Sequence, residues 1–186
     1  RYFPDELTIE NSADATDEAG SYRTWILKNH TPVEPKQYLT DEFSDASVRF
    51  INNNAETPFF LFLSYNAPHL PLAATQKYLD RFPNLSGKRK TYAAMVSAVD
   101  DGVGKTLNAL REQGILDDTL VFFLSDNGGP HLKNASDNAP LRGGKSDIWE
   151  GGYRVPFAAR YPDDIAAGTT FQQPVLSLDI FATIAE

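Results

Sequence analysis

Two short, uninterrupted apolar runs place the strongest limit on how this chain can fold. They are PFFLFLSY at 58–65 and TLVFFL at 119–124. Runs of this length without polar alternation are typical of strands that are covered on both faces, as in a parallel sheet. Between them, a set of apolar residues recurs at helical spacing from Thr91 to Gln113: Tyr92, Met95, Val99, Val103, Leu107 and Leu110. The order strand, helix, strand indicates an α/β fold with a mostly parallel sheet flanked by helices.

Weaker signals add further elements on both sides of this unit. Thr40 is a candidate N-cap for a helix that continues to about residue 51, and Gly114 suits the position just beyond the end of the long helix. The remaining expectations are a short helix around 73–82, a basic loop at 87–90, a third strand within 154–162 and a final helix from 177.

Length, composition and charge limit the classes of protein to which this chain can belong. The chain has 186 residues, of which 41% are hydrophobic, and this is enough for one domain with a core. No stretch approaches the roughly 18 apolar residues of a membrane span. A net charge of −8 argues against a general binder of nucleic acid. The acids are dense near the start, so we expect residues 1–37 to be an irregular acidic lead-in and 38–186 to form the core.

Polar side chains follow the second apolar run directly. Asp126 and Asn127 offer a carboxylate and an amide oxygen, the type of ligand that Ca²⁺ and Mg²⁺ take. The sequence Asp-Asn-Gly-Gly is equally suited to an Asx turn without any metal. By itself this stretch leaves the two interpretations open.

Two other loops carry candidate functional residues. His69 lies between prolines directly after the first apolar run, as a candidate general acid or base, or anion contact, or else as an ordinary loop histidine. Lys145 lies in PLRGGKSDIWEGGYRVP at 140–156, where two Gly-Gly pairs let backbone approach a ligand closely. Its ammonium group is a candidate contact for sulfate or phosphate oxygens.

Together these stretches resemble the sulfatases, in the arylsulfatase B-like branch. The resemblance runs in order through FLFLSYNAPHLPL, YAAMVSAVDDGVGKTLNALREQGILDDTLVFFLSDNGG and PLRGGKSDIWEGGYRVP. It implies the alkaline-phosphatase-like fold, present here as a partial domain, and the hydrolysis of sulfate esters with calcium and a formylglycine nucleophile. By position it implies that Asp126 and Asn127 are metal ligands. It also implies that His69 and Lys145 are catalytic and substrate-binding residues at the sulfate.

The chain departs from the family pattern at the nucleophile. The family carries a C/S-x-P-S/A-R motif whose first residue becomes formylglycine, and no such motif occurs in these residues, which contain no cysteine. The resemblance therefore implies a central fragment, with the nucleophile and the early Asp-Asp pair of the calcium site upstream. We expect this chain alone to be inactive.

Partners and rival functions follow from the same residues. The expected partner is a sulfated small molecule or sulfated carbohydrate, with no nucleic acid, and the family favours a periplasmic or secreted location. One rival is a phosphate or phosphonate ester hydrolase of the same superfamily, although its two-zinc members prefer histidine where Asn127 stands. The other is a sulfatase-like binding module without catalysis. The sequence does not distinguish which sulfate ester is bound.

Overall fold

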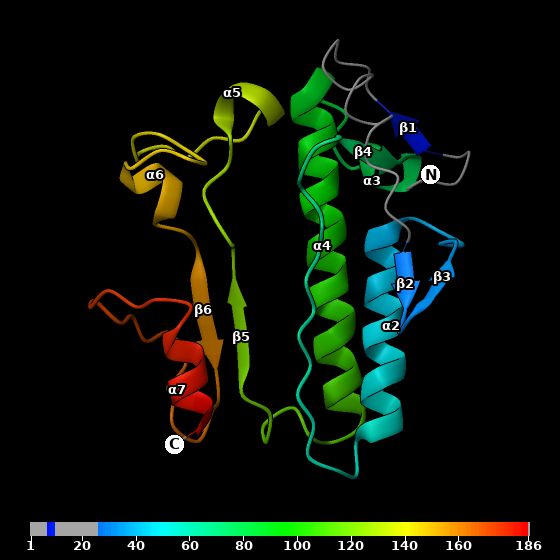
Figure 1. Cartoon of the computed structure of the whole chain (residues 1–186), viewed down its shortest axis with the longest axis vertical. Coiled ribbons are helices and arrows are strands. Elements are labelled where there is room, and N and C mark those ends of the chain that lie inside the picture. The colour runs from blue at the N-terminus through cyan, green and yellow to red at the C-terminus, as the bar shows by residue number, and fades with distance from the viewer. Residues whose placement is uncertain (1–6, 10–25, 186) are drawn as a thin grey trace.

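Two long helices lie side by side and organise the first half of the protein (Figure 1). The computed structural model describes residues 7–9 and 26–185. Helix α2 spans Leu39–Asn54 and helix α4 spans Gly87–Glu112. The amphipathic helix predicted from Thr91 is therefore confirmed, and it begins one turn earlier. No helix in the part of the chain that the structure describes is long and apolar enough to cross a membrane.

Small and hydroxyl-bearing residues let the two helices approach closely. The hydroxyl groups of Ser44 and Tyr65 are 2.9 Å apart, and those of Ser47 and Thr106 are also 2.9 Å apart. Gly102 faces this seam, where an added Cβ would lie 2.3 Å from both the Ser44 Oγ and the Tyr65 hydroxyl oxygen. Burial raises the pKa of Tyr65, which keeps its hydroxyl group neutral in the seam. The absence of a side chain at Gly102 is what leaves room for Tyr65.

Two apolar clusters flank the seam along α4. One surrounds the start of α4 and contains Tyr78, Met95 and Leu72, which are nearly inaccessible to solvent. The other lies near the end of α4 and contains Ile51, Leu110 and Leu116, with Phe59 and Leu61 of the first apolar run packed against it. The core therefore lies between the helices and one side of the 58–65 segment.

In the part of the chain that the structure describes, the strands form three separate antiparallel pairs. Strand β1 (Leu7–Ile9) pairs with β4 (Ala73–Thr75), β2 (Ile26–Lys28) with β3 (Thr31–Val33), and β5 (Val121–Leu124) with β6 (Phe157–Arg160). The predicted strand at 119–124 is thus confirmed as β5, and the third predicted strand as β6. Their pairing is antiparallel because the loop between them reverses the direction of the chain.

The mostly parallel sheet predicted from the sequence is not seen among these pairs and stays a prediction. Residues 58–65, predicted as its first strand, have no regular secondary structure assigned, although burial alternates from Pro58 to Tyr65 as in a strand with one covered face. They run in the same direction as β5, toward the end of the molecule at the top of Figure 1.

Several predicted boundaries are corrected by the structure. Thr40 lies inside α2 and Tyr38 is the N-cap, because the buried Tyr38 hydroxyl donates to the Ala73 carbonyl oxygen at 2.9 Å and draws the helix start back. Residues 87–90 form the first turn of α4 instead of a loop. The short helix expected around 73–82 is β4 followed by α3 (Gln76–Leu79).

The lead-in is also more regular than predicted. Within residues 1–37, β1, β2 and β3 are strands, so this segment is not irregular throughout. Residues 1–6 and 10–25 lie outside the described residues.

The second half of the protein contains the β5–β6 pair and three short helices. These are α5 (His131–Asn134), α6 (Glu150–Tyr153) and α7 (Asp179–Ala185), of which α7 is the final helix that the sequence predicts. Helix α7 buries no side chain within the part that the structure describes. Gly114, at the end of α4, has a φ of +74°, which confirms the predicted left-handed exit from that helix.

We predict opposite effects for two glycine substitutions on α4. Gly102→Ala should lower the free energy of unfolding by about 1–3 kcal/mol, because its methyl group would overlap the Ser44 and Tyr65 hydroxyls. Gly104→Ala meets nothing within 4 Å and should be neutral or stabilise by up to about 1 kcal/mol, through helix propensity. Urea unfolding followed by circular dichroism tests both. Equal destabilisation by the two variants would contradict the close packing of the seam.

A second prediction concerns acid stability. Two hydrogen bonds of 2.8 Å from the Arg81 guanidinium to the Asp101 carboxylate lower the pKa of Asp101. Since the folded pKa is below the unfolded value, this stabilisation is present at neutral pH and is lost as pH falls below about 4 through the folded pKa. Asp101→Asn should therefore be less stable than the parent chain at pH 7, and the difference should vanish near pH 2. A difference that persists at pH 2 would assign the effect to packing.

Candidate functional site

The candidate site residues lie on loops at one end of the molecule. Both the 58–65 segment and β5 run toward the top of Figure 1, and the turn that carries His69 and the loop after β5 lie at that end. This is the placement that parallel strands give to ligand-binding loops.

His69 is held in a turn anchored on both sides by buried residues. Ala67 and Leu72 belong to the apolar cluster at the start of α4, and the His69 amide donates to the Asn66 carbonyl oxygen at 2.9 Å. The Nδ1 atom lies 2.7 Å from the Leu70 carbonyl oxygen, a contact that requires hydrogen on Nδ1. Nε2 of this exposed imidazole has no hydrogen bond to the described residues, so it is available to exchange a proton with a bound molecule.

The loop after β5 is built from two glycine segments that interlock. The Gly128 amide donates to the Gly152 carbonyl oxygen at 2.9 Å, and the Lys145 amide to the Gly129 carbonyl oxygen at 3.4 Å. A Cβ on Gly128 would lie 1.7 Å from the Gly151 carbonyl oxygen, so no other residue fits at this approach. A Cβ on Gly151 would likewise lie 2.3 Å from the Gly143 carbonyl oxygen, so both segments need glycine.

Asn138 joins the same two segments and was missed by the sequence reasoning. Its Nδ2 donates to the carbonyl oxygens of Gly129 and Gly143, at 2.8 and 3.1 Å, while its Oδ1 accepts from the Gly129 amide at 3.0 Å. Both N–H groups and the oxygen atom of this one side-chain amide therefore form hydrogen bonds with backbone groups. The only sequence signal was an asparagine midway between the two glycine segments.

Lys145 is positioned by its backbone and leaves its ammonium group available. Its side chain is half-buried, and its Nζ has neither a hydrogen bond nor an ion pair to the described residues. The neighbouring Gly144 amide donates to the Asp147 carboxylate at 2.9 Å, which fixes the turn. On the same loop, the Arg142 guanidinium lies 3.9 Å from the centroid of the Trp149 ring, a cation–π contact.

Asp126 and Asn127 are the first residues of this loop, and their side-chain oxygen atoms make few contacts with the described residues. The Asp126 carboxylate is exposed, and no ion pair to it exists in the described part of the chain. Asn127 uses its Nδ2 on the Gly128 carbonyl oxygen at 3.1 Å, which leaves its Oδ1 for another partner. Across residues 7–9 and 26–185, no cluster of three or more His, Cys, Asp or Glu residues forms a complete metal site.

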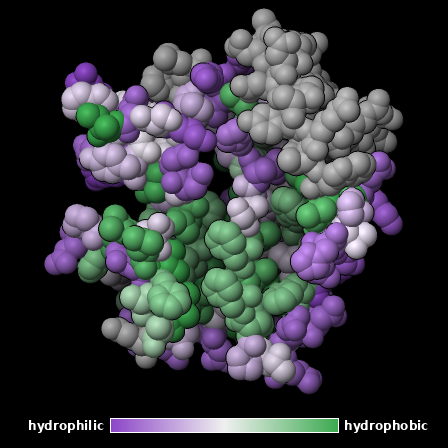
Figure 2. Space-filling model, viewed as in Figure 1, coloured by the Kyte–Doolittle hydropathy of each residue, from purple (hydrophilic) through white to green (hydrophobic). Residues whose placement is uncertain are grey.

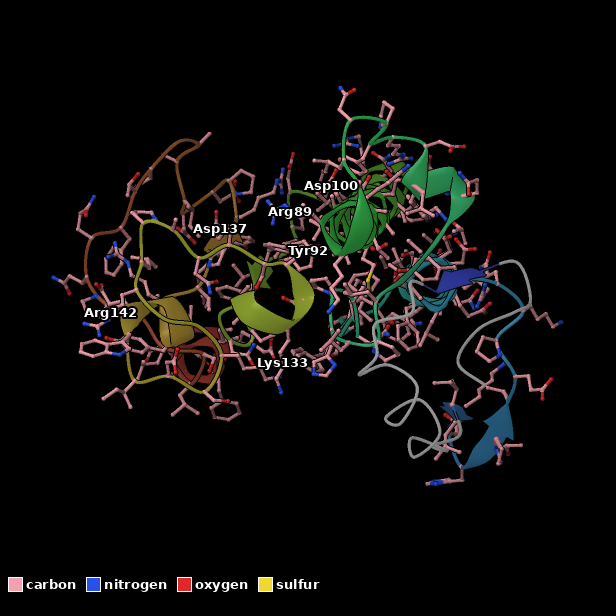
Figure 3. All side chains as sticks on the ribbon, turned by 90° about the horizontal axis from the view of Figure 1, so that it is seen from above. Arg89, Tyr92, Asp100, Lys133, Asp137 and Arg142 are labelled. Atoms are coloured by element: carbon pink, nitrogen blue, oxygen red, sulfur yellow. The ribbon has the colours of Figure 1, made fainter. Side chains whose placement is uncertain are left out.

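The structure brings three of the four predicted residues together. Asp126, Asn127 and Lys145 are held on one interlocked loop, whereas no hydrogen bond or ion pair links His69 to them. The two halves meet at this end through the start of α4, where Arg89 donates to the Ala135 carbonyl oxygen at 2.7 Å. Figure 3 shows Arg89 and Tyr92 on the side of α4 that lies toward α5, the helix that carries Lys133, with Arg142 farther out. The assigned roles of all four residues stay predictions.

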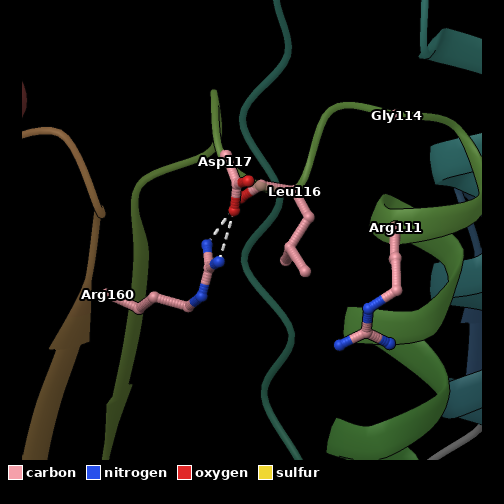
Figure 4. Close-up of a pocket in the computed structure, with 5 residues that line it drawn as sticks. All are labelled: Arg111, Gly114, Leu116, Asp117 and Arg160. Atoms are coloured by element: carbon pink, nitrogen blue, oxygen red, sulfur yellow. Dashed lines mark hydrogen bonds and ion pairs between the residues drawn. The ribbon is translucent and has the colours of Figure 1, made fainter. Parts of the chain in front are cut away.

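A second junction lies at the other end of α4. A pocket of about 300 Å³ is lined there by Arg111, Gly114, Leu116, Asp117 and Arg160 (Figure 4). Arg160 donates to the Leu116 carbonyl oxygen at 2.7 Å and pairs with Asp117 at 2.5 Å. This pocket is separate from the candidate residues and serves to join β6 to the loop after α4.

We predict that this chain alone binds Ca²⁺ weakly. Asp126 and Asn127 supply two oxygen ligands, whereas Ca²⁺ takes about 6–8. Calorimetry should show no sub-micromolar affinity. Any weak binding should be lost in Asp126→Asn and kept in Asp163→Asn, a control in an exposed loop. Tight binding would mean that other acids complete the site.

Comparisons with known proteins agree on one family. The family model "Sulfatase" matches residues 2–186. An arylsulfatase of Hemicentrotus pulcherrimus is 32% identical over 99% of this chain and 33% of its own length. The human steryl-sulfatase is 34% identical over 87% of this chain and 29% of its own length. This chain therefore spans about a third of the length of these curated relatives.

Two solved structures are also similar to this chain. The crystal structure of Ps i-CgsB is 41% identical and superposes with a TM-score of 0.86, covering 100% of this chain and 42% of that one. The same protein was solved in complex with k-i-k-neocarrahexaose.

Proposed function

The chain belongs to the sulfatase family, and we propose that it carries the sulfate-binding and leaving-group side of a sulfate ester hydrolase. The single observation that supports this most is the glycine interlock, which holds Lys145 beside the loop of Asp126 and Asn127. A tight backbone contact of this kind fixes the position of the residue and leaves its charged group available for a ligand. The nucleophile would be a formylglycine on polypeptide outside these 186 residues.

Lys145 and His69 would divide the work at the sulfate ester. The Lys145 ammonium would bind the sulfate oxygens and offset the charge that develops on them. His69, protonated and holding its Nδ1 hydrogen on the Leu70 carbonyl oxygen, would donate the Nε2 proton to the departing alcohol oxygen as the S–O bond breaks. The contact with Leu70 supports this role, because it engages Nδ1 and leaves Nε2 without a hydrogen bond to the described residues.

Asp126 and Asn127 would hold part of a calcium site. Their carboxylate and amide oxygens are hard ligands, which fit Ca²⁺ better than zinc. A bound cation would supply positive charge next to the sulfate. Within this chain the two residues provide oxygen atoms and a rigid backbone, since Ser125 Oγ donates to the Asn127 carbonyl oxygen at 2.9 Å.

The proposed substrate is a sulfated carbohydrate. Ps i-CgsB, 41% identical over the whole chain, binds a neocarrahexaose, and this supports a carbohydrate over a small aryl sulfate. Trp149 is 45% exposed on the loop that carries Lys145. An exposed indole next to a cation is suited to the apolar face of a sugar ring and to its anionic substituents.

Two other functions compete with this proposal. A phosphate or phosphonate ester hydrolase would use the same fold, but Asn127 is a poor ligand for the two-zinc site of such enzymes. A binding module without catalysis would keep Lys145 and have no use for the His69 geometry. The two alternatives predict different outcomes in the experiment below.

A chimera tests the proposed roles. The region of Ps i-CgsB that matches this chain is replaced by residues 1–186, and release of sulfate from k-i-k-neocarrahexaose is measured. We expect His69→Ala to lower kcat by about 10²–10⁴-fold, as for the loss of a positioned acid. Lys145→Ala should lower kcat/KM by about 10²–10³-fold, comparable with the loss of one donor to a developing anion.

The chain offers matched controls for both variants. His30→Ala and Lys28→Ala change the same residue types in the β2–β3 hairpin and should leave the rates unchanged. The chain alone should show only background turnover with added Ca²⁺. A chimera that folds but prefers phosphate esters would favour the first alternative. Binding of sulfated oligosaccharides without turnover would favour the second.

A further inference from the structure

The loop after β5 contains Asn127-Gly128, the only asparagine–glycine pair in the sequence. Such a pair is chemically labile in flexible polypeptide, because glycine has no side chain to hinder attack by its own backbone nitrogen. The Gly128 nitrogen forms a bond to Cγ of Asn127, while Nδ2 takes up the amide hydrogen and leaves as ammonia. Water then opens the resulting succinimide ring at one of its two carbonyl carbons, which yields aspartate or isoaspartate.

In the folded chain, hydrogen bonds hold both ends of the peptide unit that joins these two residues. The Gly128 amide donates to the Gly152 carbonyl oxygen at 2.9 Å, which is one of the contacts of the glycine interlock. On the other end of the unit, the Asn127 carbonyl oxygen accepts from Ser125 Oγ at 2.9 Å. The attacking nitrogen therefore keeps its hydrogen engaged, and the plane of its peptide unit cannot rotate while both contacts persist.

The side chain of Asn127 is restrained as well. Its Nδ2, the group that must leave, donates to the Gly128 carbonyl oxygen at 3.1 Å. The Asn127 side chain is half-buried and Gly128 is buried. Three hydrogen bonds and the packing of the loop thus oppose the approach of Cγ to the Gly128 nitrogen.

Opening of the interlock would remove these restraints together. Asn138 is the side chain that holds the interlock closed, through its hydrogen bonds to Gly129 and Gly143. Loops that are held by a few hydrogen bonds open more often than the whole domain unfolds. Figure 2 shows mainly hydrophilic residues around α5 and α6, at the end of the molecule that carries this loop. Water is therefore at hand to hydrolyse a succinimide there.

We propose that Asn127 is a deamidation site that stays unreactive while the glycine interlock is closed and reacts when the interlock opens. The change is one-way, because the nitrogen of Gly128 carries no hydrogen in the succinimide and cannot donate to Gly152. Isoaspartate adds a methylene group to the main chain, and both products place a new negative charge at residue 127. This inference does not depend on the roles of His69 or Lys145 or on a bound cation.

Peptide mapping by mass spectrometry tests the proposal. Trypsin cleaves after Arg111 and Lys133, and Asn127 is the only asparagine in the fragment between them, so the mass of that fragment reports its deamidation. In one mildly alkaline buffer, we expect deamidation at least ~10-fold slower in the folded chain than in the chain unfolded by urea. Asn138→Ala should raise the rate in the folded chain about 10-fold, toward the rate in urea. Asn108→Ala, an exposed change of the same type on α4, should leave the rate unchanged.

Each other outcome overturns the proposal. Equal rates in the folded and unfolded chains would show that the closed interlock gives no protection. A parental rate in Asn138→Ala with intact helical circular dichroism would show that the interlock is not the barrier. Equal acceleration by Asn108→Ala would assign the effect to a general loss of stability. If Asn138→Ala does not fold, Ser125→Ala replaces it, because it removes only the hydrogen bond to the Asn127 carbonyl oxygen. That variant should raise the rate about 5-fold, and an unchanged rate would contradict the proposal.

Discussion

The close approach of α2 and α4 at Gly102 is the contact on which the rest of the first half depends. Because Gly102 has no side chain, the Tyr65 hydroxyl can enter the seam and reach Ser44. Tyr65 is the last residue of the extended 58–65 segment, directly before the turn that carries His69. The packing of α2 against α4 therefore fixes where the 58–65 segment ends. Because the turn that carries His69 follows directly, the same packing helps to position the imidazole. A contact between two helices thus helps to position a candidate acid.

The two halves of the protein are joined in part by arginine side chains that donate to backbone carbonyl oxygens. Arg89 connects α4 to the loop at Ala135, and Arg160 connects β6 to Leu116 at the other end. Hydrogen bonds from a charged donor are stronger than those between neutral groups, and the planar guanidinium restricts their direction. His69 lies on one half and Lys145 on the other, so the distance between them depends on these two junctions. The glycine interlock acts within one half only, which is why it groups Lys145 with Asp126 and not with His69.

The local sequence was sufficient to predict the features that depend only on residues close together in the chain. The apolar spacing of Met95 and Leu110 predicted the buried face of α4, and Gly114 predicted its left-handed exit. Boundaries failed where a distant contact decided them: Tyr38, through its bond to the Ala73 carbonyl oxygen, displaced Thr40 as the N-cap. Asn138 was missed for the same reason, since its role exists only once two glycine segments have come together. The resemblance identified the family, whereas the roles of the four site residues rest on it and on the geometry of their loops.

The composition of the chain predicts a parallel sheet, but the described residues do not form one. The residues that most strongly predicted a strand covered on both faces, Phe60 and Phe62, are among the most exposed apolar residues of the chain. Such a conflict between composition and environment is unusual in natural proteins, where local preference and global packing agree. A strand pairing is a property of two segments, and composition reports what one segment requires without naming the other. Within the described residues, the runs at 59–64 and 121–124 therefore have the composition of covered strands without the neighbours that would cover them.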